Sequence, residues 1–142
     1  MNQHERTSRT RDDRGVSAIE FSVVVPIVLL LIFLTIQAGF WMFGRNSAQH
    51  AAREGVSYLR LAGEHSDPQS FQPKAENLAY QYASELGGLH DVDVDSAIDF
   101  ETGKVTMTVS GSMDAPAGTW TVEQTVTATL EQFRPDAGYD DG

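Results

Sequence analysis

The chain has 142 residues, a formal net charge of −10 and no cysteine. Without cysteine it can form no disulfide, iron–sulfur cluster, lipoprotein anchor or thiol nucleophile. From residue 61 onward, fifteen acidic residues stand against only Lys74, Lys104 and Arg134, which argues against nucleic acid as a partner because phosphate binding needs a positive surface.

The N-terminal segment is polar and shows no apolar period. It is rich in Arg, Ser, Thr and Asp, a composition with too little apolar surface to form a core. We therefore predict a disordered leader over residues 1–15, on the cytoplasmic side of the membrane segment that follows.

An uncharged apolar run comes directly after this leader. Residues 21–43 contain no Asp, Glu, Lys or Arg, and as a helix they would be about 35 Å long, against about 30 Å for the hydrocarbon core of a bilayer. A buried helix of a soluble protein would show a polar face, and this run has none. We predict a membrane span at about residues 21–43.

A cleaved secretory signal is the rival interpretation of the same run. Its apolar core would be only about 7–15 residues long, followed by a cleavage site of small residues. Here the core is longer, and residues 35–38, Thr-Ile-Gln-Ala, lack the small residue needed before such a site. The span is therefore the favoured interpretation.

Arginines on the two sides of the span predict its orientation. Four precede it closely, whereas Arg45 and Arg53 follow it. This mild bias predicts a cytoplasmic N-terminus and an extracytoplasmic C-terminal part. Phe40, Trp41 and Phe43 would then form an aromatic anchor at the outer interface.

The helix is predicted to continue beyond the membrane. Residues 45–61 contain no proline and keep a helical period, so one helix over residues 16–61 would be about 70 Å long. Five small residues lie along one side at spacings of three and four, a pattern that lets helix backbones approach closely. The alternative is that alanine is simply a good helix former. The predicted helix-packing residues are Gly44, Ala48, Ala51, Ala52 and Gly55.

The remainder predicts a small extracytoplasmic α+β domain over residues 62–134. After a loop marked by Gly and Pro, residues 74–86 indicate a short helix that ends at a Gly-Gly pair. Beyond residue 89, apolar and polar residues alternate in about three strands of an antiparallel sheet with one apolar face. The short helix would cover that face. The acidic tail, residues 135–142, is expected to be disordered.

Three alternating aspartates suggest a cation site, since hard cations prefer clustered carboxylates. They are Asp91, Asp93 and Asp95. An EF-hand loop beginning at Asp91 would need glycine at its sixth position and glutamate at its twelfth, where the sequence has Ser96 and Thr102. In a strand the aspartates would share the solvent-exposed face, and this interpretation is favoured. We predict no metal and no cofactor.

No catalytic motif is recognisable in the chain. The four histidines are scattered without metal-ligand spacing. The nucleophile elbow, the phosphate loop, the zinc-protease helix and the dinucleotide fingerprint are all missing from the sequence. We predict that the protein is not an enzyme.

Glu20 is the one acidic residue in a helix that is otherwise uncharged over residues 16–36. A charged carboxylate at the centre of a membrane helix costs about 2.5–3.5 kcal/mol, and less near an end, so a function is the first hypothesis. The alternative is that Glu20 lies near enough to the cytoplasmic end to reach the lipid headgroups. Burial alone does not decide between the two.

The segment Arg14–Phe21 resembles the processing site of type IV prepilin-like proteins. In that family a prepilin peptidase cuts after the glycine, and a glutamate is the fifth residue of the mature chain; Gly15 and Glu20 have this spacing. With Pro26 and the segment Ala51–Gly55 downstream, the chain more specifically resembles TadE-like pseudopilins. These belong to the tight-adherence machinery, which builds the Flp or type IVb-like pilus.

The resemblance implies cleavage between Gly15 and Val16. The new amine of Val16 would carry a positive charge at neutral pH in most molecules. In the family, the glutamate is thought to pair with the N-terminal amine of a neighbouring subunit, which would make Glu20 a device that sets the register. Pro26 would leave a carbonyl without its helical partner and bend the helix. The predicted assembly residues are Glu20, Phe21 and Pro26.

The chain is much longer than a major Flp pilin, which is little more than the helix. The leading hypothesis is therefore a minor pseudopilin in the inner (plasma) membrane. Its partners would be prepilin peptidase, other pilin-like subunits and the pilus assembly platform, whether or not the protein enters the filament. The alternative is an uncleaved single-pass protein whose outer domain binds or scaffolds an envelope partner.

Overall fold

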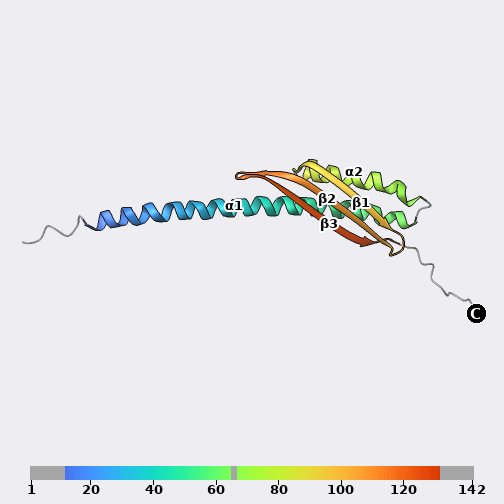
Figure 1. The fold of residues 1–142 in the computed structure, drawn as a ribbon, viewed down its shortest axis with the longest axis horizontal. Coiled ribbons are helices and arrows are strands. Elements are labelled where there is room, and N and C mark those ends of the chain that lie inside the picture. The colour runs from blue at the N-terminus through green and yellow to red at the C-terminus, as the bar shows by residue number, and fades with distance from the viewer. Residues whose placement is uncertain (1–11, 65–66, 132–142) are drawn as a thin grey trace, which may run out of the picture. The chain divides into compact units, whose positions relative to one another are not determined.

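A computed structural model describes residues 12–64 and 67–131 of the chain, with side chains from residue 18 onward except at residue 64. The elements follow one another as shown in Figure 1: α1 (Asp12–Arg60), two 3-10 turns (Leu61–Glu64 and Pro68–Phe71), α2 (Gln72–Gln81), a π turn (Tyr82–Leu86), β1 (His90–Asp99), β2 (Lys104–Ala115) and β3 (Gly118–Thr129). A long helix, a short helix and a three-stranded antiparallel sheet confirm the predicted α+β class. Most of the predicted leader and all of the acidic tail lie outside the described residues.

The chain forms two compact units, Met1–Ala38 and Gly39–Gly142. In the described part of the first unit the backbone is helical throughout, and the helix continues through Pro26. The hydroxyl of Ser22 donates to the carbonyl oxygen of Ala18 at 2.9 Å. The hydroxyl of Thr35 donates to that of Leu31 at 2.8 Å. Both hydroxyl donors are therefore satisfied without water, as an apolar solvent requires.

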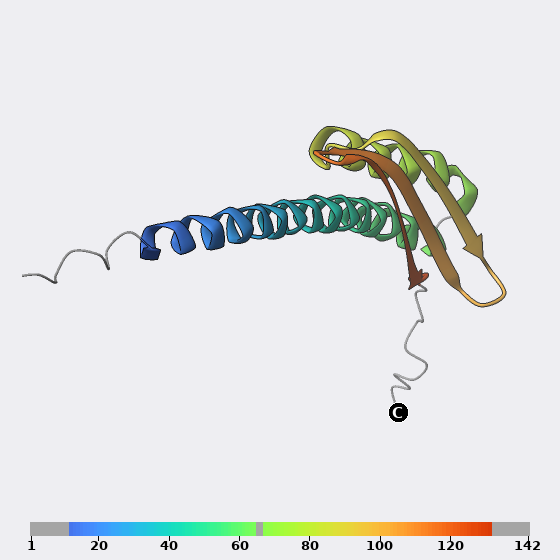
Figure 2. The ribbon, with the colours of Figure 1, turned by 60° about the vertical axis from the view of Figure 1, so that its left-hand side comes forward.

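The second unit contains residues 39–60 of α1, the short helix and the sheet. The strand order is β1-β2-β3, so β2 is central and pairs antiparallel with both neighbours. The short helix α2 lies chiefly against β1, and Figure 2 shows it running beside that strand. Two hydrogen bonds join them: Ser96 Oγ donates to Glu76 Oε1 at 2.6 Å, and Gln72 Nε2 donates to the Ser96 carbonyl at 3.2 Å.

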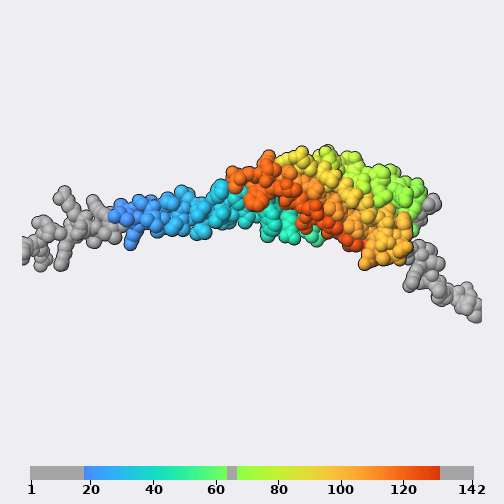
Figure 3. All heavy atoms as spheres, in the orientation of Figure 1, coloured from blue at the N-terminus to red at the C-terminus, as the bar shows by residue number. Residues whose placement is uncertain are grey.

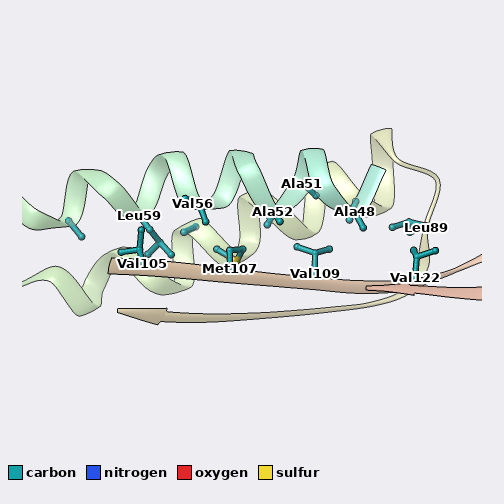
Figure 4. Packing of buried hydrophobic residues seen from close by; sticks show 14 of the residues in the cluster. Ala48, Ala51, Ala52, Val56, Leu59, Leu89, Val105, Met107, Val109 and Val122 are labelled. Atoms are coloured by element: carbon teal, nitrogen blue, oxygen red, sulfur yellow. The ribbon is translucent and has the colours of Figure 1, made fainter. Parts of the chain in front are cut away.

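One hydrophobic core joins the two helices to the inner face of the sheet (Figure 4). Buried residues alternate with less buried ones along β2, which confirms the predicted two-residue period. The buried core consists of Ala48, Ala51, Ala52, Val56, Leu59, Ala62, Ala75, Ala79, Ala83, Leu89, Val105, Met107, Val109, Met113, Val122 and Leu130. Five of these come from α1, so the second part of the long helix is a wall of the folded domain.

The structure also refines several predicted boundaries. The short helix begins two residues before the predicted Lys74 and changes to a π turn at Tyr82. The last part of the sheet is one strand of 12 residues. The predicted loop between the helices contains two 3-10 turns.

The far end of α1 is bound to the end of β3. Arg60 makes a salt bridge to Glu131 at 3.2 Å, and its Nε donates to the Thr129 carbonyl at the same distance. The Glu131 amide in turn donates to the Arg60 carbonyl at 3.2 Å. A Cβ at Gly63 would lie 2.3 Å from the Glu131 carbonyl oxygen, so glycine is needed for this close approach.

Candidate processing and assembly helix

The predicted cleavage site lies near the beginning of α1. Because the helix begins at Asp12, the backbone of Gly15 and Val16 is helical; the surroundings of their side chains lie outside the described residues. The first four N–H groups of a helix have no partner within it. The bond after Gly15 is therefore in the part of α1 that is easiest to unwind.

Glu20 and Phe21 are both exposed on α1. Phe21 is 70% exposed, and within the described residues no ion pair or hydrogen bond of the Glu20 side chain is found. The carboxylate is therefore available to a group outside this chain. Pro26, the third predicted assembly residue, lies further along the same helix.

The apolar part of α1 is exposed on all sides. Its exposed large side chains are Ile19, Phe21, Val23, Val24, Ile27, Val28, Leu29, Leu30, Leu31, Ile32, Phe33, Leu34 and Ile36. Soluble monomers rarely expose a continuous apolar surface of this size. Over the described residues, one helix, Ala18–Gly63, is long and apolar enough to cross a membrane. This surface therefore indicates a membrane location.

Aromatic side chains mark the end of the apolar part. Phe40, Trp41 and Phe43 are exposed, and the Arg45 guanidinium lies 5.4 Å from the centroid of the Trp41 ring. A cation over an indole ring combines an apolar body with a charged end, an arrangement suited to the lipid–water interface.

The five predicted helix-packing residues are all buried, and their contacts are made within this chain. A Cβ at Gly44 would lie 3.2 Å from Met113 Sδ and 3.5 Å from Val122 Cγ1. Figure 3 shows β3 covering this part of α1. The absent side chain therefore lets the sheet approach the helix.

At Gly55 the two helices approach each other closely. A Cβ there would lie 3.1 Å from Ala79 Cβ, 3.2 Å from the Ala75 carbonyl oxygen and 2.6 Å from Met107 Cε. Ala75 and Ala79 are themselves fully buried on α2. Small residues on both helices therefore bring α1 and α2 together under the sheet.

The opposite side of α1 is polar and exposed. It carries Asn46, His50, Arg53 and Ser57 at spacings of four, three and four. We call these four residues the outer stripe. No motif in the sequence marks these four residues, although a stripe of small residues on one side of a helix already implies a distinct surface on the other.

The three aspartates considered as a cation site are exposed on β1. Val92 and Val94, which alternate with them, pack against the core. In the part of the chain that the structure describes, no group of three or more His, Asp or Glu side chains is placed to hold a metal ion. Asp91, Asp93 and Asp95 thus lie on the solvent-exposed face of the strand.

Asp99 is a structural carboxylate that the sequence analysis did not identify. It closes the turn between β1 and β2 by accepting hydrogen bonds from the Thr102 hydroxyl at 2.6 Å, the Thr102 amide at 3.1 Å and the Glu101 amide at 2.9 Å. The bonds from Thr102 hold the pKa of Asp99 below its usual value.

Comparison with known proteins gives one match. Residues 15–57 match the family model described as TadE-like protein. Over these residues the chain is similar to that family. The matched region includes Gly15, Glu20 and the apolar run and ends before α2. No curated protein and no solved structure matches the chain.

The TadE-like family is one of structural pilus components and not of enzymes. The match covers less than half of the chain and includes the apolar part of the candidate membrane span. It does not extend to the sheet.

Proposed function

We propose that this protein is a minor pseudopilin of a tight-adherence (Flp) pilus and has no enzymatic activity. Prepilin peptidase cuts it between Gly15 and Val16, its N-terminus faces the cytoplasm, and its folded domain lies outside the inner membrane. The observation that carries the proposal is that one helix combines the TadE-like match, the pair Gly15 and Glu20, and an apolar surface exposed on all sides.

The proposed role of Glu20 is to bind the charged N-terminus of a neighbouring subunit. A carboxylate in an apolar helix is costly unless it is paired. Within the described chain Glu20 has no such pair, and after cleavage Val16 would supply a positive charge of the right kind. Pairing at one depth in the membrane would fix the register between subunits, with Phe21 and Pro26 shaping the contact.

Other pilin-like subunits have two surfaces of α1 open to them. The stripe from Gly44 to Gly55 is already used inside the chain. Neighbours would therefore pack on the apolar residues before Ala38 and on the outer stripe. The assembly platform would meet the protein through the same helix.

The decisive experiment is to express the full chain with a prepilin peptidase and to determine the mature N-terminus by mass spectrometry. We expect Val16 as the first residue and expect Gly15→Ala to block the cut. The matched control is Gly39→Ala, because a Cβ at Gly39 would meet nothing within 4 Å; this variant should be cut normally.

An uncut wild-type chain, or a different first residue, would refute the proposal. The uncleaved single-pass protein considered from the sequence predicts that outcome. It also predicts that pilus assembly is indifferent to Gly15→Ala.

A further inference from the structure

Contacts inside the second unit give the position of the β2–β3 hairpin along the axis of α1, which we call its level. Met107 contacts α1 at Gly55, and Met113 contacts it at Gly44. In Figure 4 Val105 lies beside Leu59. The strand β2 therefore runs antiparallel to α1, and each further residue of β2 lies nearer to the beginning of the folded part of the helix.

Beyond Met113 the hairpin continues toward the end of the apolar segment. Two more residue pairs, Asp114 with Thr119 and Ala115 with Gly118, lead to the turn. At about 3.3 Å per strand residue the turn lies about 7–10 Å past Met113. That distance equals roughly five or six residues of α1 at 1.5 Å each. Measured back from Gly44, the turn is level with residues 38–39, directly before Phe40.

The chemistry of the hairpin end suits the lipid–water interface. Its turn, residues 115–118, is Ala-Pro-Ala-Gly and carries no charge. Trp120, the partner of Met113 in the sheet, is 42% exposed. Tryptophan is enriched where headgroups meet hydrocarbon, the depth that the aromatic residues at the end of the span would also occupy.

Charged residues limit the depth of this contact. Asp114 is exposed, lies 3.6 Å from His90 Nε2, and accepts a hydrogen bond from the Thr119 hydroxyl at 2.8 Å. A carboxylate in hydrocarbon would be costly. The hairpin end therefore fits the headgroup layer and not the membrane interior.

We propose that the end of the β2–β3 hairpin, residues 115–120, is a second membrane contact that rests on the outer headgroups beside the span. A single helix leaves a domain free to turn about the helix axis. A second contact at the side fixes which surface of the domain, including the outer stripe, is presented to neighbours. The proposal depends on the membrane span and not on the pilus role, so the two can fail separately.

The test uses the two tryptophans of the chain, Trp41 and Trp120. The full-length Trp41→Phe variant keeps Trp120 as its sole tryptophan and is reconstituted in phosphatidylcholine vesicles. The quencher is a phosphatidylcholine with a nitroxide on its headgroup or, in a second series, in the middle of its acyl chain. We expect stronger quenching of Trp120 by the headgroup nitroxide than by the mid-chain one.

The control places the reporter at the other end of the sheet. Phe100, in the turn between β1 and β2, is 55% exposed. It follows Asp99, which is joined across the sheet to Thr129, and the Thr129 carbonyl accepts a hydrogen bond from Arg60 of α1. Phe100 is therefore level with the Arg60 end of α1, about 24 Å further along the helix than Gly44. The variant Trp41→Phe/Trp120→Phe/Phe100→Trp should be quenched at least about twofold less by the headgroup nitroxide.

Two outcomes would overturn the proposal. If aqueous iodide quenches Trp120 and the headgroup nitroxide does so no more than in the control, the hairpin end lies in water. If neither quencher reaches Trp120, a second copy of the chain or another protein covers it. Far-ultraviolet circular dichroism of each variant confirms that the reporters belong to folded protein.

Discussion

The two parts of α1 show how one continuous helix can serve two solvents. Before Ala38 the described helix has apolar side chains on every side, and every large one except Val25 is exposed. After Gly39 it is amphipathic, with small residues buried against the chain's own α2 and sheet and the outer stripe exposed. A helix that is apolar on all sides is stable in an apolar environment, whereas an amphipathic helix is stable when its apolar side packs against a folded domain. The change from one pattern to the other marks where the folded domain begins.

A pair of leucine truncations should give the largest effect and would test this contrast directly. Leu59 is fully buried in the second part of α1, whereas Leu30 is exposed in the first. Leu59→Ala should lower the free energy of unfolding of the domain by about 2–5 kcal/mol, because it leaves a cavity. Leu30→Ala should leave it unchanged within about 0.5 kcal/mol.

Denaturant unfolding of the full chain in nanodiscs, followed by near-ultraviolet circular dichroism, measures both variants. Equal effects would show that the domain does not begin where the pattern changes.

A pair of glycine substitutions would sharpen the same contrast. At Gly55 a Cβ would press on Ala79, on the Ala75 carbonyl and on Met107, whereas at Gly39 it would meet nothing within 4 Å. Gly55→Ala should cost about 1–3 kcal/mol through overpacking. Gly39→Ala should be neutral or stabilise by up to about 1 kcal/mol, because alanine is the better helix residue. The same unfolding assay measures both, and a stabilised Gly55→Ala would contradict the close contact between α1 and α2.

A substitution at Glu20 would distinguish an effect on subunit assembly from an effect on the stability of the domain. Because its side chain is exposed and has no ion pair among the described residues, Glu20→Gln should change domain stability by less than about 0.5 kcal/mol. It should nevertheless reduce cross-linking between subunits in membranes, since the amide cannot pair with a neighbour's charged amine. Glu54→Gln, in the folded part of α1, is the control and should keep that cross-linking. Unimpaired cross-linking in Glu20→Gln would remove the proposed register role.

The smallest expected effect concerns the turn at Asp99. Its pKa is lowered in the folded state by the bonds from Thr102. The carboxylate therefore stabilises the fold above its unfolded-state pKa, and this contribution is lost as the pH falls through the lowered folded-state pKa. Asp99→Asn should lower the melting temperature at neutral pH, and the difference from wild type should disappear in strong acid.

Melting curves measured from neutral pH downward test this prediction. Asp95→Asn is the control, because Asp95 is exposed and makes no side-chain hydrogen bond among the described residues. A difference for Asp99→Asn that persists in strong acid would mean that the loss is not due to ionisation.

Sequence patterns that lie within one element were sufficient to predict much of the secondary structure of this protein. The length and uniform apolarity of residues 21–43 predicted the span, and strict alternation around Val105 and Val109 predicted a half-buried strand. Glycine and proline at the ends of elements separated the short helix from the strands. Such signals are local because a helix or strand repeats its side chains at a fixed period whatever it packs against.

Partners were decided by the tertiary structure alone. The stripe from Gly44 to Gly55 was recognisable in the sequence as a surface for close packing, but only the fold shows that α2 and the sheet occupy it. Likewise, the level of Trp120 along α1 follows from the antiparallel course of β2 and not from any pattern near residue 120. The sequence determined which surfaces must be covered, and long-range packing decided what covers them, because contacts between distant segments depend on the fold and not on local period.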